Sequence, residues 1–238
     1  MKIALIGYGK MGKEIEKIAL AKGHEIVLKI STHDLADFTA ENIKRADVCI
    51  EFSTPDTAFQ NVKKCLEAGV PVVCGTTAWL TQLEEAKSLC IKNNTAFLYA
   101  SNFSIGVNLF FALNKHLAKL MQVHTEYNVQ MEEIHHTQKK DAPSGTAVTL
   151  AEGILENSHI KKSWINTEGN NPTELSILSK RIDPAPGTHT ITYSSSIDDI
   201  SITHTAHNRQ GFATGALLAA EFLVGKKGVF EISDVLGM

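Results

Sequence analysis

Short apolar runs alternate with longer amphipathic segments from the start of the chain to about Tyr99. The apolar runs are typical of buried strands, and the segments between them have the spacing of apolar residues that is typical of helices. The pattern predicts strands over residues 2–6, 25–30, 47–52, 71–74 and 96–99, with helices over residues 10–22, 57–68 and 80–92.

This alternation predicts βαβ units, because strands that are separated by helices of this length pair in parallel. We therefore expect an α/β fold of the Rossmann type, with a doubly wound parallel sheet that carries helices on both faces.

The alternation of short apolar runs and amphipathic segments changes after Ser104. The later pattern predicts helices over residues 106–121 and 144–155, strands over residues 127–134, 175–182, 189–193 and 197–203, and loops over residues 157–172 and 184–187. The Thr- and Ser-rich alternation favours a largely antiparallel or mixed sheet, and hence a second α+β domain. A final helix over residues 211–224 is rich in small residues and is expected to pack back on the first domain. The predicted domains are residues 1–104 with 209–238, and residues 105–208.

Composition excludes several classes of protein. The chain has 238 residues, 23 Lys and Arg against 26 Asp and Glu, and a net charge of −3. Such a balance gives no reason to expect nucleic acid or a membrane surface as a partner. The first apolar run stops at Gly7, too early for a signal peptide, and no apolar stretch approaches the ~20 residues that span a bilayer. A cytoplasmic location is expected.

Four cysteines lie in the first half at wide spacings, without a Cys-x-x-Cys pair. This pattern predicts buried free thiols, and neither a disulfide framework nor a zinc site.

A glycine motif, Gly7-Tyr8-Gly9-Lys10-Met11-Gly12, follows the first strand and opens the first helix. In a dinucleotide-binding fold the first glycine permits a tight turn, the second lets a pyrophosphate approach the backbone, and the third lets helix and strand pack closely. The helix start then supplies N–H groups and the positive end of the helix dipole. The position of the motif therefore predicts a dinucleotide site; a merely structural glycine turn is the alternative.

Ser31 stands at the end of the second strand, where an acidic residue usually holds the ribose hydroxyls of NADH. Without that carboxylate the protein would tolerate or prefer NADPH. The alternative is that Asp34 supplies the acid from a shifted register, and the sequence leaves both open.

Two further turns follow strands of the predicted parallel sheet, Gly75-Thr76-Thr77 and Ala100-Ser101-Asn102-Phe103. Open α/β sheets bind ligands at the carboxyl ends of their strands, so we expect both turns to face the nicotinamide half of a cofactor.

The most unusual stretch runs from Glu133 to Ala147 and contains His135, His136 and Lys139 before Pro-Ser-Gly-Thr. The last four residues are typical of a helix start with proline in the first turn. Backbone N–H groups there can bind a carboxylate, while imidazole and ammonium groups supply charge and a proton. The stretch therefore predicts an anion site beside an acid. A metal site lacks further ligands at a standard spacing, a pair of structural surface histidines remains possible, and Ser144 lacks the context of a nucleophile.

The chain resembles the 4-hydroxy-tetrahydrodipicolinate reductases, also called dihydrodipicolinate reductases, of bacterial lysine synthesis. The most specific segment is His-His-x-x-Lys-x-Asp-Ala-Pro-Ser-Gly-Thr, and the resemblance extends over nearly the whole length. Its other segments are the glycine motif, residues 51–55, 75–77, 100–104, 204–209, 212–216 and 234–237. The glycine loop has the shorter of its forms in the family, and Ser31 stands where family members frequently have an acidic residue.

The resemblance implies roles for individual residues. His135 would be a proton donor or acceptor, Lys139 the acid, His136 a substrate contact, and Gly145 and Thr146, with Ser144, the binding site of a substrate carboxylate. The implied cofactor contacts are Gly7, Tyr8, Gly9, Lys10, Met11, Gly12, Ser31, Gly75, Thr76, Thr77, Ala100, Ser101, Asn102 and Phe103.

The resemblance also implies an NAD(P)H-dependent reductase of a cyclic dicarboxylic imine in the diaminopimelate route. NADPH, NADH or both would serve, no metal is implied, and family members are commonly homotetramers built through the second sheet. Closure of the two domains is expected near Ser104 and residues 207–209. A nicotinamide-binding redox sensor, or a dehydrogenase of another imine or amino acid, is the competing prediction.

Overall fold

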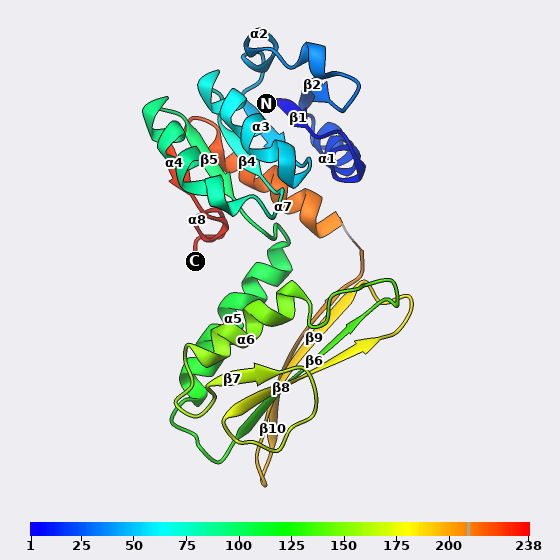
Figure 1. The fold of residues 1–238 in the computed structure, drawn as a ribbon, viewed down its shortest axis with the longest axis vertical. Helices are drawn as coiled ribbons and strands as arrows, with labels where there is room; N and C mark the ends of the chain where they lie inside the picture. The colour runs from blue at the N-terminus through cyan, green and yellow to red at the C-terminus, as the bar shows by residue number, and fades with distance from the viewer. Residues whose placement is uncertain (209) are drawn as a thin grey trace. The chain divides into compact units, whose positions relative to one another are not determined.

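The computed structural model describes residues 1–208 and 210–238. It divides into two compact units: the first comprises residues 1–105 and 210–238, and the second comprises the segment between them (Figure 1). Arg209, the predicted domain boundary and part of the predicted hinge, lies outside the described residues. The Rossmann-type fold with a second, mixed-sheet unit is confirmed.

The first unit is built on a six-stranded parallel sheet in the order β11-β5-β4-β3-β1-β2. Its strands are β1 (Lys2–Ile6), β2 (Glu25–Ile30), β3 (Val48–Glu51), β4 (Val72–Cys74), β5 (Ala96–Tyr99) and β11 (Gly228–Phe230). The central strands are apolar on both faces because helices cover both faces.

The register aligns the carboxyl ends of five strands in one row. Ile6 pairs with Ile30 on one side and Glu51 on the other, Glu51 pairs with Cys74, and Cys74 pairs with Tyr99. The loops that follow these residues therefore leave the sheet side by side, and four of them carry the predicted cofactor residues.

Two pairs of helices cover this sheet. Helices α3 (Pro55–Glu67) and α4 (Leu83–Lys92) pack on one face, and α1 (Lys10–Ala21) and α7 (Gln210–Leu223) pack on the other. Close packing of α7 depends on small residues: a Cβ at Gly215 would lie 1.7 Å from the Phe103 carbonyl oxygen.

The sequence analysis did not predict several short elements of the first unit. They are α2 (Ala40–Ile43), the 3-10 turns η1 (Leu35–Asp37) and η2 (Leu80–Gln82), β11, and α8 (Ile232–Leu236). They are too short to show a hydrophobic period. The prediction of buried free thiols is confirmed for all four cysteines.

The second unit contains a mixed sheet in the order β10-β9-β6-β8-β7. Its strands are β6 (Asn128–His135), β7 (Ser163–Ile165), β8 (Glu174–Arg181), β9 (Gly187–Ser194) and β10 (Asp199–Ala206). Strand β6 is antiparallel to β9 and parallel to β8. Helices α5 (Ile105–Met121) and α6 (Gly145–Leu155) cover one face, with Phe110, Leu150 and Ile177 in the shared core.

Two predictions for the second unit need correction. Residues 157–172 are not entirely loop, because Ser163–Ile165 pair with β8 as β7. A strand of 3 residues between turn-forming residues shows no recognisable pattern in the sequence. Pro143 does not lie in the first turn of α6, because Ser144 caps the helix and Pro143 precedes the cap.

Along the described residues, none of the helices combines the length and the apolar character that a membrane span requires.

Candidate functional site

The glycine motif has a distinct environment at each glycine. A Cβ at Gly7, where φ is +96°, would lie 1.9 Å from the Phe52 carbonyl oxygen, and a Cβ at Gly12 would lie 2.6 Å from the Gly7 oxygen. Among the described residues, no atom lies within 4 Å of a Cβ at Gly9. The first and third glycines therefore allow close packing, and the second leaves open space beside the backbone at the start of α1. This arrangement fits a dinucleotide pyrophosphate.

The residues between these glycines contribute side chains of different kinds. The Tyr8 hydroxyl hydrogen-bonds to Glu16, and the Lys29 ammonium lies 5.1 Å from the centre of the Tyr8 ring. Lys10 is exposed, and Met11 packs against the core.

The loops after β3 and β4 are joined to each other. The Ser53 N–H donates to Thr76 Oγ1 at 2.8 Å, and a Cβ at Gly75 would collide with the Phe52 ring at 2.1 Å. Thr76 is 6% exposed, so its side chain fixes the loop from inside, whereas Thr77 is exposed.

The loop after β5 is also partly internal. Phe103 is 2% exposed and packs against Phe52 in a tilted arrangement, with 5.7 Å between ring centres. Its ring belongs to the core, so a cofactor contact by this residue would involve its backbone. Ser101 is exposed, and the Asn102 side chain accepts a hydrogen bond from the Ser104 N–H.

At the end of β2, Asp34 folds back onto Ser31. Its carboxylate accepts hydrogen bonds from the Ser31 hydroxyl and from the Ser31 N–H, the latter at 3.1 Å. These bonds lower the pKa of Asp34, the hydroxyl having the larger effect. A carboxylate therefore stands beside Ser31, as the shifted-register alternative expected.

The second group of predicted residues lies where β6 ends and α6 begins. Strand β6 includes His135, one residue beyond the predicted end. Ser144 Oγ caps α6 by accepting the Ala147 N–H at 3.2 Å. Across the described part of the chain, the N–H groups of Gly145 and Thr146 have no partner, as is usual in a first helical turn. Gly145 is exposed, so these two donors are available to an anion.

Both polar groups of Ser144 are used inside the protein. Its Oγ lies 3.1 Å from His189 Nε2, and its N–H donates to Glu133 at 3.1 Å. Ser144 is 2% exposed. Ser144 therefore holds the start of α6, and its predicted substrate contact stays a prediction.

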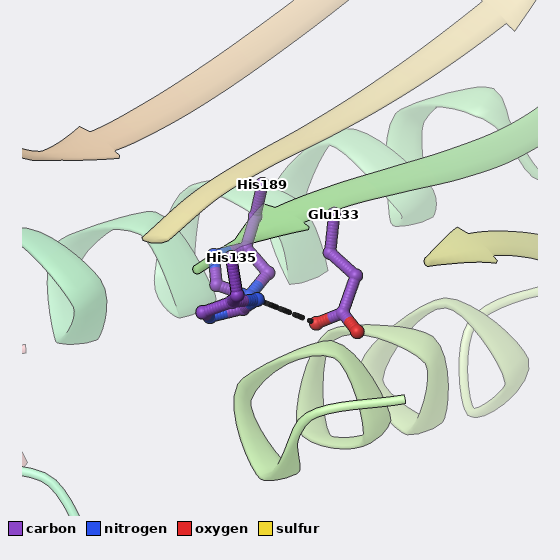
Figure 2. A group of neighbouring side chains, drawn as sticks. All are labelled: Glu133, His135 and His189. Carbon is purple, nitrogen blue, oxygen red and sulfur yellow. Dashed lines mark ion pairs between the residues drawn. The ribbon is translucent and has the colours of Figure 1, made fainter. Parts of the chain in front are cut away.

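A buried carboxylate, Glu133, joins four elements of the second unit. Its oxygens accept hydrogen bonds from the Ser144 N–H before α6, from Ser179 Oγ on β8 at 2.8 Å, and from the Arg181 guanidinium at 3.4 Å. They also lie 3.4 Å from His135 Nδ1 and 3.6 Å from His189 Nε2 on β9 (Figure 2).

Lys139 lies on the loop between β6 and α6. Its ammonium pairs with Asp141 at 2.8 Å. Arg181 donates to the backbone oxygens of both residues, at 3.3 Å for Lys139 and 2.6 Å for Asp141. Arg181 therefore connects the Lys139 loop to Glu133.

The other end of this loop is fixed by Asp183. Its carboxylate accepts from the Thr137 N–H at 3.0 Å and from the Thr137 hydroxyl at 2.6 Å. These hydrogen bonds from Thr137 lower the pKa of Asp183, and His136, half-buried next to this anchor, adds a smaller effect in the same direction.

Glu133 and His135, the two central groups of this site, differ in their charge at neutral pH. Burial raises the pKa of Glu133, but hydrogen bonds from His189, Ser144 and Ser179 outweigh it and hold the pKa well below its usual range. Burial, assisted by the charges of Lys139 and Arg181, lowers the pKa of His135 to about 4 despite the opposing effect of Glu133. At neutral pH the site therefore contains an anionic Glu133 and a neutral His135.

Glu133, His135 and His189 each offer one ligand-type atom, and the three atoms lie within 4.8 Å of one another. A metal ion here would compete with the guanidinium of Arg181 and with two other donors, the Ser144 N–H and Ser179 Oγ, that already bind the same carboxylate. Repulsion between the two cations at such short range is large. We therefore interpret the three residues as a hydrogen-bonding cluster.

A cavity of about 660 Å³ lies near the opposite end of β6, lined among others by Asn128, Lys161 and Tyr193. It contains none of the predicted site residues. The Lys161 ammonium is held by the Asn128 side chain and the Glu174 carbonyl, so it joins the starts of β6 and β8.

Sequence reasoning missed four residues that build this site: Arg181, His189, Ser179 and Glu133. Glu133 opened the unusual stretch, yet it was given no role. The other three lie 46 to 56 residues further along the chain, and only the pairing of β8 and β9 with β6 brings them to it.

Comparison with known proteins covers both units. The family model described as "Dihydrodipicolinate reductase, N-terminus" matches residues 1–103, and the model described as "Dihydrodipicolinate reductase, C-terminus" matches residues 106–236. The chain belongs to the dihydrodipicolinate reductase family.

Individual relatives of this reductase family match the whole chain. A 4-hydroxy-tetrahydrodipicolinate reductase from Christiangramia forsetii is 52% identical, covering 99% of this chain and 98% of the relative. One from Methanoregula boonei is 31% identical, covering 100% and 98%. A solved structure of dihydrodipicolinate reductase from Paenisporosarcina sp. TG-14 with dipicolinate bound matches with a TM-score of 0.77 and 25% identity, covering 97% of each chain.

Proposed function

We propose that this chain is a 4-hydroxy-tetrahydrodipicolinate reductase, which reduces a small cyclic dicarboxylate with a nicotinamide dinucleotide as the hydride donor. The full-length match at 52% identity is the observation that carries this proposal. The two free N–H groups at the start of α6 support it, because a dicarboxylate needs such donors.

The first unit would bind the cofactor. The open backbone at Gly9 and the start of α1 would receive the pyrophosphate, and the loops after β4 and β5 would lie along the nicotinamide half, with Thr77, Ser101 and Asn102 as the accessible side chains. Bound there, a reduced nicotinamide supplies the hydride.

Asp34 bears on the choice of cofactor. Its carboxylate would accept hydrogen bonds from the ribose hydroxyls of NADH, whereas the 2′-phosphate of NADPH would meet a like charge. We therefore propose that NADH is used at least as well as NADPH.

The second unit would bind and protonate the substrate. The N–H groups of Gly145 and Thr146 would hold one carboxylate, and His136 would contact the ring or the second carboxylate. Lys139 would donate the proton while its positive charge balances the dicarboxylate. In the overall reaction the ring takes up one hydride and one proton, and the 4-hydroxy form also loses water.

The proton donor is better assigned to Lys139 than to His135, because a histidine whose pKa is about 4 is neutral at neutral pH, and a neutral imidazole is a very weak acid. His135 would serve as a neutral hydrogen-bonding group toward the substrate.

The second sheet would also build the assembly, which we propose is a cytoplasmic homotetramer. On the face opposite α5 and α6, strands β9 and β10 carry a row of short uncharged pairs. Their hydroxyl separations are 3.3 Å for Thr188–Thr205, 3.1 Å for Thr190–Thr203 and 2.9 Å for Thr192–Ser201. A flat row without charge suits packing against a second copy. Sedimentation analysis would test it: a monomer would contradict it.

The reaction is tested by following the absorbance of the reduced nicotinamide. The substrate is generated in place from pyruvate and aspartate semialdehyde by the synthase that condenses them, with NADH and NADPH in separate runs. The proposal predicts oxidation that requires the synthase. If either cofactor binds but neither is oxidised, the proposal is wrong, and a redox sensor or another imine dehydrogenase replaces it.

A further inference from the structure

The pairing of three strands brings Glu133 and His135 into one buried group. The two residues stand two positions apart on β6 and therefore point to the same face of the sheet. In the register, Glu133 stands between His189 on β9 and Ser179 on β8, and His135 stands beside Arg181. Glu133 is 0% exposed and His135 is 7% exposed.

The two ring nitrogens of His135 differ in their surroundings. Nδ1 is shielded from solvent and makes no hydrogen bond among the described residues, and the Glu133 carboxylate lies 3.4 Å from it (Figure 2). Nε2 lies next to Gly187, and a Cβ at that glycine would come within 3.0 Å of it. An anion beside Nδ1 favours a proton on that nitrogen and leaves the lone pair on Nε2.

We propose that Glu133 is a positioning residue: it fixes His135 as the neutral Nδ1–H tautomer, so that Nε2 faces the substrate as a hydrogen-bond acceptor. The same carboxylate binds the Ser144 N–H, so it holds the imidazole and the carboxylate-binding start of α6 in one arrangement. This inference deepens the proposed function and rests on it for the substrate.

The other charged or titratable groups around His135 are consistent with this tautomer. From β9 the ring faces His189, with 5.1 Å between ring centres, from β8 it faces Arg181, and from the following loop it faces Lys139. All three disfavour a positive charge on His135, so Glu133 orients the neutral ring without making it a cation.

The tautomer itself can be observed in the full-length wild-type protein. Long-range ¹H–¹⁵N correlation spectra distinguish Nδ1–H, Nε2–H and doubly protonated histidines, and His135→Asn identifies the signal. We expect Nδ1–H from pH 6 to pH 8. An Nε2–H tautomer or an imidazolium at pH 7 would overturn the proposal. This measurement needs no substrate, so its failure is distinguishable from a failure of the proposed reaction.

A matched pair of variants tests the role of the carboxylate. Glu133→Gln keeps the shape and removes the charge, and the neighbouring Glu132→Gln makes the same change on the other face of β6, where Glu132 pairs with Lys180. We expect Glu133→Gln to remove the preference for Nδ1–H and to raise KM for the substrate about tenfold, the contribution of one hydrogen bond. Glu132→Gln should leave the tautomer unchanged. An unchanged tautomer in a folded Glu133→Gln variant would contradict the proposal.

A second variant covers the case in which Glu133→Gln fails to fold. Gly187→Ala would place a methyl group about 3.0 Å from Nε2 while Glu133 and its partners remain. We expect the Nδ1–H tautomer to persist while KM for the substrate rises at least tenfold. Unchanged KM and kcat would show that Nε2 does not face the substrate.

Discussion

The two proposed binding regions, a cofactor half in the first unit and a substrate half in the second, are built in different ways. In the first unit the backbone forms the site: Gly7 and Gly12 allow close packing, Gly9 leaves space, and a helix start offers N–H groups. In the second unit the predicted anion site is also a helix start, but buried side chains from three strands hold it in place through Glu133. The first half should therefore tolerate loss of any one side chain, whereas the second half should not.

The largest effect is expected from Lys139→Ala. Turnover should fall by about 10²–10⁴-fold, because the variant lacks the proposed proton donor. The coupled nicotinamide assay measures it, and the exposed neighbour Lys140→Ala is the matched control, with turnover near the wild type. Turnover close to wild type in Lys139→Ala would remove this residue from the mechanism.

The next effect concerns stability in acid. The folded-state pKa of His135, about 4, lies below the ordinary value of about 6.5. Between these values the unfolded chain binds a proton that the folded chain does not, so the free energy of unfolding falls as pH decreases from about 6.5 to about 4, by up to about 3 kcal/mol. Glu133, whose folded-state pKa is lowered, adds a further loss below about pH 4.5.

Urea unfolding of wild type and His135→Asn across this pH range tests the point. The difference between the two proteins should change between pH 6.5 and pH 4. If the free energies of unfolding of the two proteins depend on pH in parallel, His135 is not held neutral. His124 is exposed, so His124→Asn serves as the control.

Substitutions of two glycines in the first unit should affect stability and cofactor binding separately. Gly7→Ala should destabilise the protein by about 2 kcal/mol or more, because its Cβ would collide with the Phe52 carbonyl and its φ is positive. Gly9→Ala should change stability by less than about 0.5 kcal/mol and weaken NADH binding about tenfold or more. Urea unfolding and calorimetric titration measure both; equal destabilisation by the two changes would contradict this assignment.

The smallest effect is expected from Asp34→Asn. Removing the negative charge beside Ser31 should raise the ratio of NADPH to NADH efficiency by about tenfold. Steady-state kinetics with each cofactor measure the ratio. A wild-type preference for NADPH that Asp34→Asn leaves unchanged would support the earlier hypothesis that Ser31 sets the choice.

These two halves also differ in how far the sequence predicts them. The strand–loop–helix context of Gly7–Gly12 is local, so the parallel sheet and the glycine loop follow from neighbouring residues. The start of α6 at Ser144 is local too, because Ser caps a helix that begins with Gly-Thr.

The partners of Glu133 are not local. Arg181 and His189 reach it only through the register of β6 with β8 and β9, and no hydrophobic period encodes that register for single side chains. Asp34 is different, because its partner is local: a turn of three residues returns its carboxylate to Ser31, and the sequence offered it as one of two alternatives. Short elements such as β7 are not predicted, because they contain too few residues to show a pattern.

The most direct test of this account is calorimetric titration of wild type, Gly9→Ala and Glu133→Gln with two ligands. NADH is titrated first, and dipicolinate, a planar dicarboxylate, is then titrated into the NADH-saturated protein. We predict that Gly9→Ala weakens NADH binding alone and that Glu133→Gln weakens dipicolinate binding alone. If Glu133→Gln leaves the affinity for dipicolinate unchanged, or weakens NADH binding equally, the buried carboxylate does not organise the substrate half of the site.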